Sequence, residues 1–154
     1  MAACTLRPFN ETDPDWLLEW YRADRKGLED FMGMELPNET QYMHVLQAML
    51  DTVLQGAAMF WMLEREDHPL GFFLMTDFTE ANRCARIHIY MDPEQRRYSI
   101  QAAKAIDTAL TLQMKKRGLQ QVIASMGTAN KGAHALAKRM GFHTLPQVIL
   151  AKEI

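Results

Sequence analysis

Cysteines, glycine-rich motifs and metal-ligand patterns are scarce in this 154-residue chain. Only two cysteines occur, Cys4 and Cys84, which excludes a disulfide framework or a cysteine-rich zinc site and favours two reduced thiols. No G-x-G is present, so the chain has neither a dinucleotide-binding fingerprint nor a P-loop. The five histidines do not cluster at ligand spacing, and we therefore expect no metal site.

An excess of charge and long apolar runs are also missing. The 17 Lys and Arg against 19 Asp and Glu give a formal net charge of −2, which argues against nucleic acid as a partner. The longest apolar runs, such as residues 57–63, are too short to cross a membrane, and the first residues lack the charged and apolar stretches of a secretory signal. We expect a cytoplasmic protein.

What is present is the composition of one ordinary globular domain. Hydrophobic residues make up 48% of the chain and charged residues 23%, close to the average for folded proteins. No repeat, Ser/Gly-rich linker or composition break divides the sequence. Residues 1–154 are therefore expected to form a single domain.

Hydrophobic periodicity alternates between strand-like and helix-like stretches. Thr12-Asp13-Pro14-Asp15 supplies a capping side chain, a first-turn proline and acids, and Asn38 has capping-box spacing to Gln41. Gly56 and Gly118 follow the last periodic residues of two helices. The expected helices run from Pro14, from Asn38 to about Gly56, from Pro93 to Gly118 and over 130–140, and the expected strands are 4–9, 57–65, 70–78, 84–91, 120–126 and 147–152.

This pattern gives the order β-α-α-β-β-β-α-β-α-β. Three consecutive strands, with turns at residues 66–69 and 80–83, predict an antiparallel meander. The meander leads into a β-α-β crossover, which requires a parallel pair. We therefore predict an α/β fold in which a mixed sheet carries helices on both faces.

The junction after the third meander strand could bind an anion. A strand ends at Met91, a Pro-containing turn follows, and a long helix begins beside Arg96 and Arg97. Free backbone N–H groups and the dipole at a helix N-terminus attract phosphate groups. On this stretch alone the simpler interpretation is that Ser99 caps the helix and both arginines are solvated.

The element order and the second half of the chain resemble the GCN5-related N-acetyltransferase (GNAT) family. The segment PEQRRYSIQAAKAIDTALTLQMKKRGLQQVIASMGTANKGAHALAKRMGF is similar to that family's acetyl-CoA region. Asn130, Lys138-Arg139 and Gly141-Phe142 match its N-x-x-[SA]…[EK]-[KR]-[LM]-G-F segment. The resemblance implies that an acetyl group passes from acetyl-CoA to an amine, on a small molecule or a protein N-terminus, by direct attack.

The same resemblance implies a cofactor site in a V-shaped split between the strands 84–91 and 120–126. Backbone groups near Tyr90, Met91 and Asp92 would hold the pantetheine arm, and Asn130 would approach it from the other strand. Trp16, Trp20 and Tyr21 would wall the acceptor site. The pyrophosphate would bind at the turn formed by Arg96, Arg97, Tyr98, Ser99, Ile100 and Gln101.

This turn departs from the family pattern [RQ]-x-x-G-x-[GA]. Anchored on Pro93, Ser99 and Gln101 stand at the two glycine positions, where a glycine lets the backbone close around phosphate without a Cβ in the way. If the helix at Ala102-Ala103 sets the register instead, these positions fall on Arg97 and Ser99, and neither register restores a glycine. A Gln101 or Arg97 side chain could therefore fill the space that the phosphate needs. The tyrosine that often serves as general acid is replaced by Ala137.

The acid often found on the third meander strand is missing as well. Arg86, His88 and Tyr90 share one face of that strand, because side chains alternate along a strand. Our hypothesis is that His88 accepts a proton and Tyr90 donates one. The alternative is that His88 is a packed, hydrogen-bonded side chain of the sheet.

Two functions other than catalysis are compatible with these motif losses. The chain could be an inactive relative that serves as an interaction or assembly protein, for example a phage virion component. It could also be a regulatory domain that binds acyl-CoA without turnover. Edge strands expected at residues 4–9 and 147–152 make a homodimer plausible.

Overall fold

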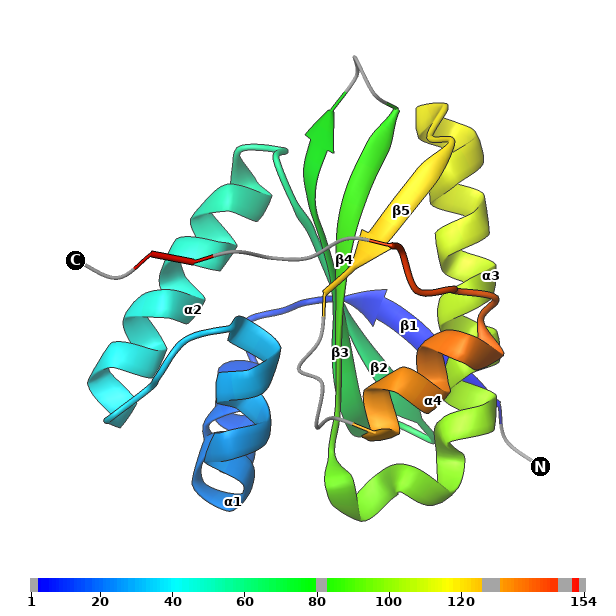
Figure 1. The fold of residues 1–154 in the computed structure, drawn as a ribbon. Coiled ribbons are helices and arrows are strands. Elements are labelled where there is room, and N and C mark those ends of the chain that lie inside the picture. Colours follow the sequence, from blue (N-terminus) through cyan, green and yellow to red (C-terminus); the bar gives the residue numbers. More distant parts are fainter. Residues whose placement is uncertain (1–2, 80–82, 126–130, 147–150, 153–154) are drawn as a thin grey trace.

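A five-stranded sheet with helices on both faces forms the computed structural model, which describes residues 3–79, 83–125, 131–146 and 151–152 (Figure 1). The strands are β1 Cys4–Pro8, β2 Met59–Arg65, β3 His68–Thr79, β4 Cys84–Met91 and β5 Gln121–Ala124. The helices are α1 Pro14–Met32, α2 Glu39–Leu54, the 3₁₀ helix η1 Pro93–Tyr98, α3 Ser99–Arg117 and α4 Lys131–Arg139. The structure thus has the predicted order of helices and strands from β1 to α4.

The sheet has the mixed topology that the sequence predicts. The strand order is β1-β2-β3-β4-β5, with antiparallel pairs up to β4 and a parallel pair between β4 and β5. The turn from β2 to β3 is shorter than expected, since only Glu66 and Asp67 lie outside the strands and both have positive φ. Two residues with φ > 0 form the turn that matches the twist of a hairpin.

Two hydrophobic cores lie on opposite faces of the sheet. On one face Phe60, Phe72 and Tyr90 pack against the buried residues of α1 and α2. On the other face Phe73, Ile87 and neighbouring residues pack against α3. Figure 1 shows α1 and α2 on one side of the sheet and α3 and α4 on the other. Alternate residues of β4 therefore face different helical layers.

The two N-terminal helices begin differently. The side chain of Asn38 accepts a hydrogen bond from the Gln41 N–H, as predicted, and caps α2. Asp13 stands at the corresponding position of α1, but its side chain makes no capping bond. That carboxylate is fully buried and accepts two hydrogen bonds from the Arg7 guanidinium, 2.7 and 2.9 Å long. The residue expected to cap α1 therefore forms an ion pair that links α1 to β1.

Two other predicted segments are the helix after Pro93 and the strand near the C-terminus. The helix expected directly after Pro93 begins as η1 and becomes α-helical only at Ser99, ending at the left-handed Gly118 as predicted. Residues 147–150 of the expected terminal strand lie outside the described residues, and the neighbouring Ala151 and Lys152 have no regular secondary structure. No described helix is long and apolar enough to cross a membrane.

Candidate active site

The parallel pair of strands separates partway along β4. Among the described residues, pairing between β4 and β5 runs from Cys84 opposite Gln121 to Ile87 opposite Ala124 and no further. β4 continues to Met91 without this partner, although it stays paired with β3 as far as Gly71. The described part of the sheet therefore has the predicted split between these strands, and it opens after Ile87 and Ala124, near the middle of β4.

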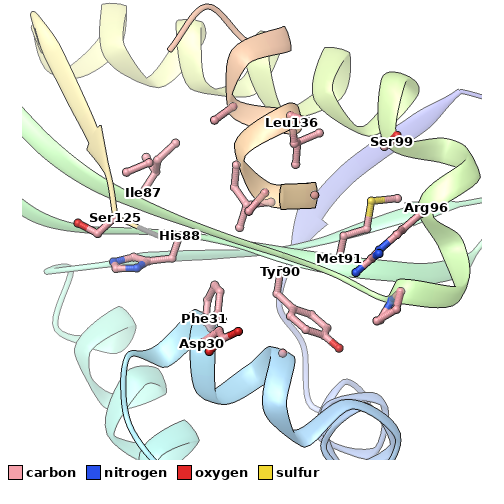
Figure 2. Close-up of a pocket in the computed structure, with 18 of the residues that line it drawn as sticks. Asp30, Phe31, Ile87, His88, Tyr90, Met91, Arg96, Ser99, Ser125 and Leu136 are labelled. Atoms are coloured by element: carbon pink, nitrogen blue, oxygen red, sulfur yellow. The ribbon is translucent and has the colours of Figure 1, made fainter. Parts of the chain in front are cut away.

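A cavity of about 520 Å³ occupies this split. Its walls come from α1 on one side of the sheet, from η1, the start of α3 and α4 on the other, and from β4 and Ser125 between them. Figure 2 shows His88 and Tyr90 on the same side of β4 as α1, whereas Leu136 of α4 lies on the opposite side. The cavity thus connects the two faces of the sheet at the edge of β4.

Some of the predicted site residues lie together in this cavity and others do not. His88, Tyr90, Met91, Arg96 and Ser99 line it. The predicted cofactor residues that do not line it are Asp92, Arg97, Tyr98, Ile100 and Gln101. Asn130 lies outside the described residues. None of these positions tests a role in binding or catalysis, and the assigned roles stay predictions.

The Gln101 side chain lies away from the cavity. Its Oε1 atom accepts a weak hydrogen bond from the thiol of Cys4, with a sulfur–oxygen distance of 3.8 Å, on the β1 side of α3. Burial raises the pKa of that thiol, so Cys4 remains protonated and able to donate. The residue at the second missing glycine therefore does not fill the split.

The glycine-free turn folds as a 3₁₀ helix. The Asp92 side chain accepts a hydrogen bond from the Glu94 N–H and caps η1. The Ser99 N–H is donated to the carbonyl of Arg96, so it is not free for an anion. Of the groups at this turn, the exposed Arg96 side chain lines the cavity, whereas the Ser99 N–H is already used within the helix.

The two neighbouring arginines of the turn have separate environments. Arg97 lies over the ring of Tyr98, with its guanidinium carbon 4.7 Å from the ring centre, and Arg65 of β2 lies 4.5 Å from the same centre. The Arg97 hydrogen bond lowers the pKa of the Tyr98 hydroxyl. Arg97 and Tyr98 therefore form a cation–π stack outside the cavity, which leaves Arg96 as the cation that η1 contributes to it.

His88 is half-buried between the sheet and α1. Its Nε2 atom lies 3.1 Å from the hydroxyl oxygen of Thr76, and its ring contacts that of Phe31 edge to face. The Thr76 hydroxyl oxygen also lies 3.3 Å from a carboxylate oxygen of Asp77. A hydroxyl that donates to Asp77 would accept from an Nε2–H of His88, and in that tautomer Nδ1 carries the lone pair. Burial lowers the pKa of His88 against the opposing effect of Asp77, which keeps the ring neutral at pH 7.

Tyr90 is buried, and its hydroxyl donates a 2.9 Å hydrogen bond to Oδ2 of Asp24 in α1. Burial, together with the charge of Asp24, raises the pKa of Tyr90 well above its ordinary value. A phenol has a single proton to donate. In this structure that proton is donated to Asp24, so a donor role toward a substrate requires this hydrogen bond to break.

The wall contributed by α1 was missed by the sequence analysis. Trp20 and Tyr21, expected there, are buried in the core, and the cavity is lined one turn later, by Asp24, Lys26, Gly27, Asp30 and Phe31. One signal could have found this wall. Asp24 stands between Tyr21 and Leu28 on the apolar stripe of α1, where helical periodicity predicts a hydrophobic residue.

Charge is distributed unevenly around the cavity. Arg96 and Arg139 lie on the side of η1 and α4, and neither forms an ion pair within the described part of the chain. The α1 side carries Asp24, Asp30 and one cation, Lys26. The cavity therefore offers cations to an anionic ligand on one side of the sheet and carboxylates to a cationic ligand on the other.

Comparisons with known proteins agree with this architecture. The sequence model of the acetyltransferase (GNAT) domain matches residues 4–143, whereas no curated protein matches the sequence significantly. A solved probable acetyltransferase is similar with a TM-score of 0.76 at 17% identity, over 92% of this chain and 79% of the other.

Two further solved structures contain coenzyme A. A spermidine N-acetyltransferase from Vibrio cholerae, in complex with CoA and spermine, gives a TM-score of 0.71 at 17% identity over 90% of this chain and 80% of that one. RimL, a ribosomal L7/L12 alpha-N-protein acetyltransferase in complex with CoA, gives 0.73 at 16% identity over 90% and 78%. At these identities the likeness concerns the fold.

Proposed function

The chain belongs to the GNAT acetyltransferase family, and on that premise we propose that it transfers an acetyl group from acetyl-CoA to an amine by direct attack. The observation that carries the proposal is the cavity in the split between β4 and β5, which is lined by residues from both faces of the sheet. We further propose that residues 1–154 act as one domain, since the family match extends over 4–143.

The cofactor side is the side of η1 and α4. The residues there fit an elongated anionic group, because Arg96 and Arg139 line the cavity without an ion-pair partner among the described residues and Gln101 lies elsewhere. When bound, acetyl-CoA supplies a thioester carbonyl that an amine can attack. Arg96 would hold the phosphates, and the unpaired edge of β4 up to Met91 would hold the pantetheine arm.

The acceptor side is the side of α1. His88 lies between this wall and the split, and a neutral imidazole with its Nδ1 lone pair free can take the proton that the attacking amine loses. Holding the amine beside the split supplies much of the remaining rate enhancement by orientation. The Tyr90 hydroxyl donates its hydrogen bond to Asp24 and so holds that carboxylate in position in the α1 wall.

The names of two similar solved proteins give two different acceptors: spermidine for one, and the N-terminus of a ribosomal protein for the other. Both classes of acceptor present a positively charged amine in water. The carboxylates of the α1 wall suit either, and we propose an amine acceptor without assigning it to one of these two named substrates.

Calorimetry combined with thiol detection tests the proposal. Acetyl-CoA should bind at micromolar concentration, and a panel of amines should release the CoA thiol. The variant Arg96→Ala should weaken binding by roughly tenfold, since hydrogen bonds to charged groups contribute about 1.5–3 kcal/mol. Arg97→Ala is the matched control, because Arg97 stacks on Tyr98 outside the cavity, and its affinity should change much less.

The outcomes separate the functions. Absence of binding at millimolar acetyl-CoA would contradict a cofactor site of any kind. Binding without turnover of any amine would identify a regulatory domain rather than an enzyme. Equal losses in Arg96→Ala and Arg97→Ala would contradict the assignment of the phosphates to Arg96.

A further inference from the structure

The first helix is broken at the residue that faces the cavity. Asp24 has φ −144° and ψ 52°, outside the helical region, within an otherwise continuous α1. Non-helical backbone inside a helix is unfavourable and is found where the surrounding structure holds it in place. Here the break brings a carboxylate from the apolar stripe of the helix to the wall of the cavity.

Two groups hold this carboxylate in its position. The buried Tyr90 hydroxyl donates to Oδ2 over 2.9 Å, and the Gly27 N–H donates to Oδ1 over 3.3 Å. A Cβ on residue 27 would overlap the Asp24 carboxylate where it lies now, so any larger residue there would require that carboxylate to move. Three separate features, the broken helix, the missing side chain at 27 and the buried tyrosine, therefore place one carboxylate at one point of the wall.

Asp24 has hydrogen bonds but no cation. It forms no ion pair within the described residues, in contrast with Asp13, which is buried against Arg7. A carboxylate has about four lone-pair sites, and the Tyr90 hydroxyl and the Gly27 N–H occupy two of them. The remaining sites are available to a cationic ligand inside the cavity.

We propose that Asp24, oriented by Tyr90, binds a second ammonium group of the acceptor, so that the substrate is a primary amine carrying another cationic nitrogen. This inference rests on the proposed function, in which the reacting nitrogen lies beside His88. His88 and Tyr90 are two residues apart on one face of β4, which corresponds to roughly 6–7 Å along a strand. The two nitrogens of the acceptor are thus held apart by a spacer of about that length, as in an extended 1,4-diaminobutane.

Figure 2 shows the side chains that would surround this substrate. Tyr90 points from β4 toward α1, the His88 ring lies alongside the strand and points away from Tyr90, and Phe31 of α1 lies between the two. The ring of Phe31 contacts both residues, at 5.9 Å from the His88 ring and 6.2 Å from the Tyr90 ring. An alkyl spacer would lie against this aromatic surface while its two ends meet His88 and Asp24.

The experiment compares acceptors of matched length. The specificity constant kcat/KM for CoA release is measured with 1,4-diaminobutane, with n-butylamine, which lacks the second cation, and with a neutral peptide that has a free N-terminus. Diamine binding is measured separately by calorimetry in the presence of CoA. The variants are Asp24→Asn, Tyr90→Phe and, as a matched control, Glu19→Gln, which removes an exposed carboxylate of the same helix outside the cavity.

We expect the wild type to prefer the diamine to butylamine by roughly tenfold or more, as a charge-assisted hydrogen bond allows. Asp24→Asn should abolish this preference while CoA affinity is unchanged, Tyr90→Phe should reduce it, and Glu19→Gln should keep it. The preference is a ratio between two amines, so a general loss of stability would not imitate the result.

Three results would overturn the inference. The wild type could use butylamine or the peptide as well as the diamine, Asp24→Asn could keep the preference, or the diamine could fail to bind wild-type protein. If Asp24→Asn does not fold, the wild-type comparison and Tyr90→Phe decide. Diamine binding that requires Asp24, in a protein that neither binds CoA nor releases thiol, would support this site while contradicting the proposed acetyltransferase function.

Discussion

The ion pair between β1 and α1 should be a principal source of stability for the fold. Asp13 is fully buried, and its carboxylate receives two hydrogen bonds from Arg7 and a third, 2.8 Å long, from the Asn10 N–H. Arg7 also bonds Glu64 of β2 at 2.9 Å, and its pKa is raised by these carboxylates. One guanidinium therefore ties the first strand, the second strand and the first helix together.

Replacing this guanidinium leaves a buried charge without its partner. Arg7→Met keeps the aliphatic stem but removes both bonds to Asp13, and breaking a buried pair in this way costs about 3–5 kcal/mol. For a chain of this size such a loss lowers the melting temperature by roughly 6–20 °C. Asp13→Asn should cost less, because it leaves Arg7 partly exposed and still paired with Glu64.

Urea unfolding at pH 7 of the two single variants and the double variant measures these terms. The double variant Arg7→Met/Asp13→Asn should be more stable than the sum of the single changes predicts, since it contains no unpaired buried charge. Arg7→Met within about 1 kcal/mol of the wild type would refute the reasoning, because an unpaired buried charge costs more than that. If the stability lost in the double variant equals the sum of the losses in the two single variants, Arg7 and Asp13 are not energetically coupled.

Four further predictions concern the cavity. Because burial lowers the pKa of His88, the acid limb of kcat/KM should lie below the ordinary histidine value of about 6.5 and should disappear in His88→Gln; an unchanged limb would exclude His88 as the base. Asp77 opposes that lowering, so Asp77→Asn should move the limb to still lower pH, and a move to higher pH would contradict this sign. Gly71→Ala should destabilise the protein and weaken CoA binding as measured by calorimetry, because the new Cβ would overlap the Tyr90 carbonyl on β4; unchanged stability would show that β4 can shift there. Gln101→Ala should leave CoA affinity unchanged, since that side chain lies toward Cys4, and a gain in affinity would place it in the phosphate site after all.

The elements with strong local signals were predictable from the sequence. β4 begins at Cys84 and ends at Met91 as expected, because its apolar alternation is bounded by turn residues. Asn38 and Gly118 mark the start of α2 and the end of α3 through side-chain capping and a left-handed residue, which are local effects. The mixed sheet then follows from the order of the elements.

The details of the site depend on contacts between distant segments and were not predictable in this way. The periodicity of α1 continues through Asp24, so the sequence pattern predicts no break there. In the structure the helix is broken at Asp24, and its carboxylate accepts a hydrogen bond from Tyr90, which is distant in sequence. The sequence predicts that Asp13 caps α1, but in the structure its carboxylate pairs with Arg7 instead. Tyr98 at the end of the 3₁₀ helix η1 likewise contacts two arginines, one of them from the distant strand β2.

The central claim is that acetyl-CoA binds in the split where β4 leaves β5. Titration of the ¹⁵N-labelled protein with acetyl-CoA, followed by backbone amide chemical shifts, tests it residue by residue. The account predicts that the largest changes fall on the unpaired end of β4, from His88 to Met91, and on η1 at Arg96. Saturable shifts that cluster elsewhere, or none at millimolar ligand, would contradict it.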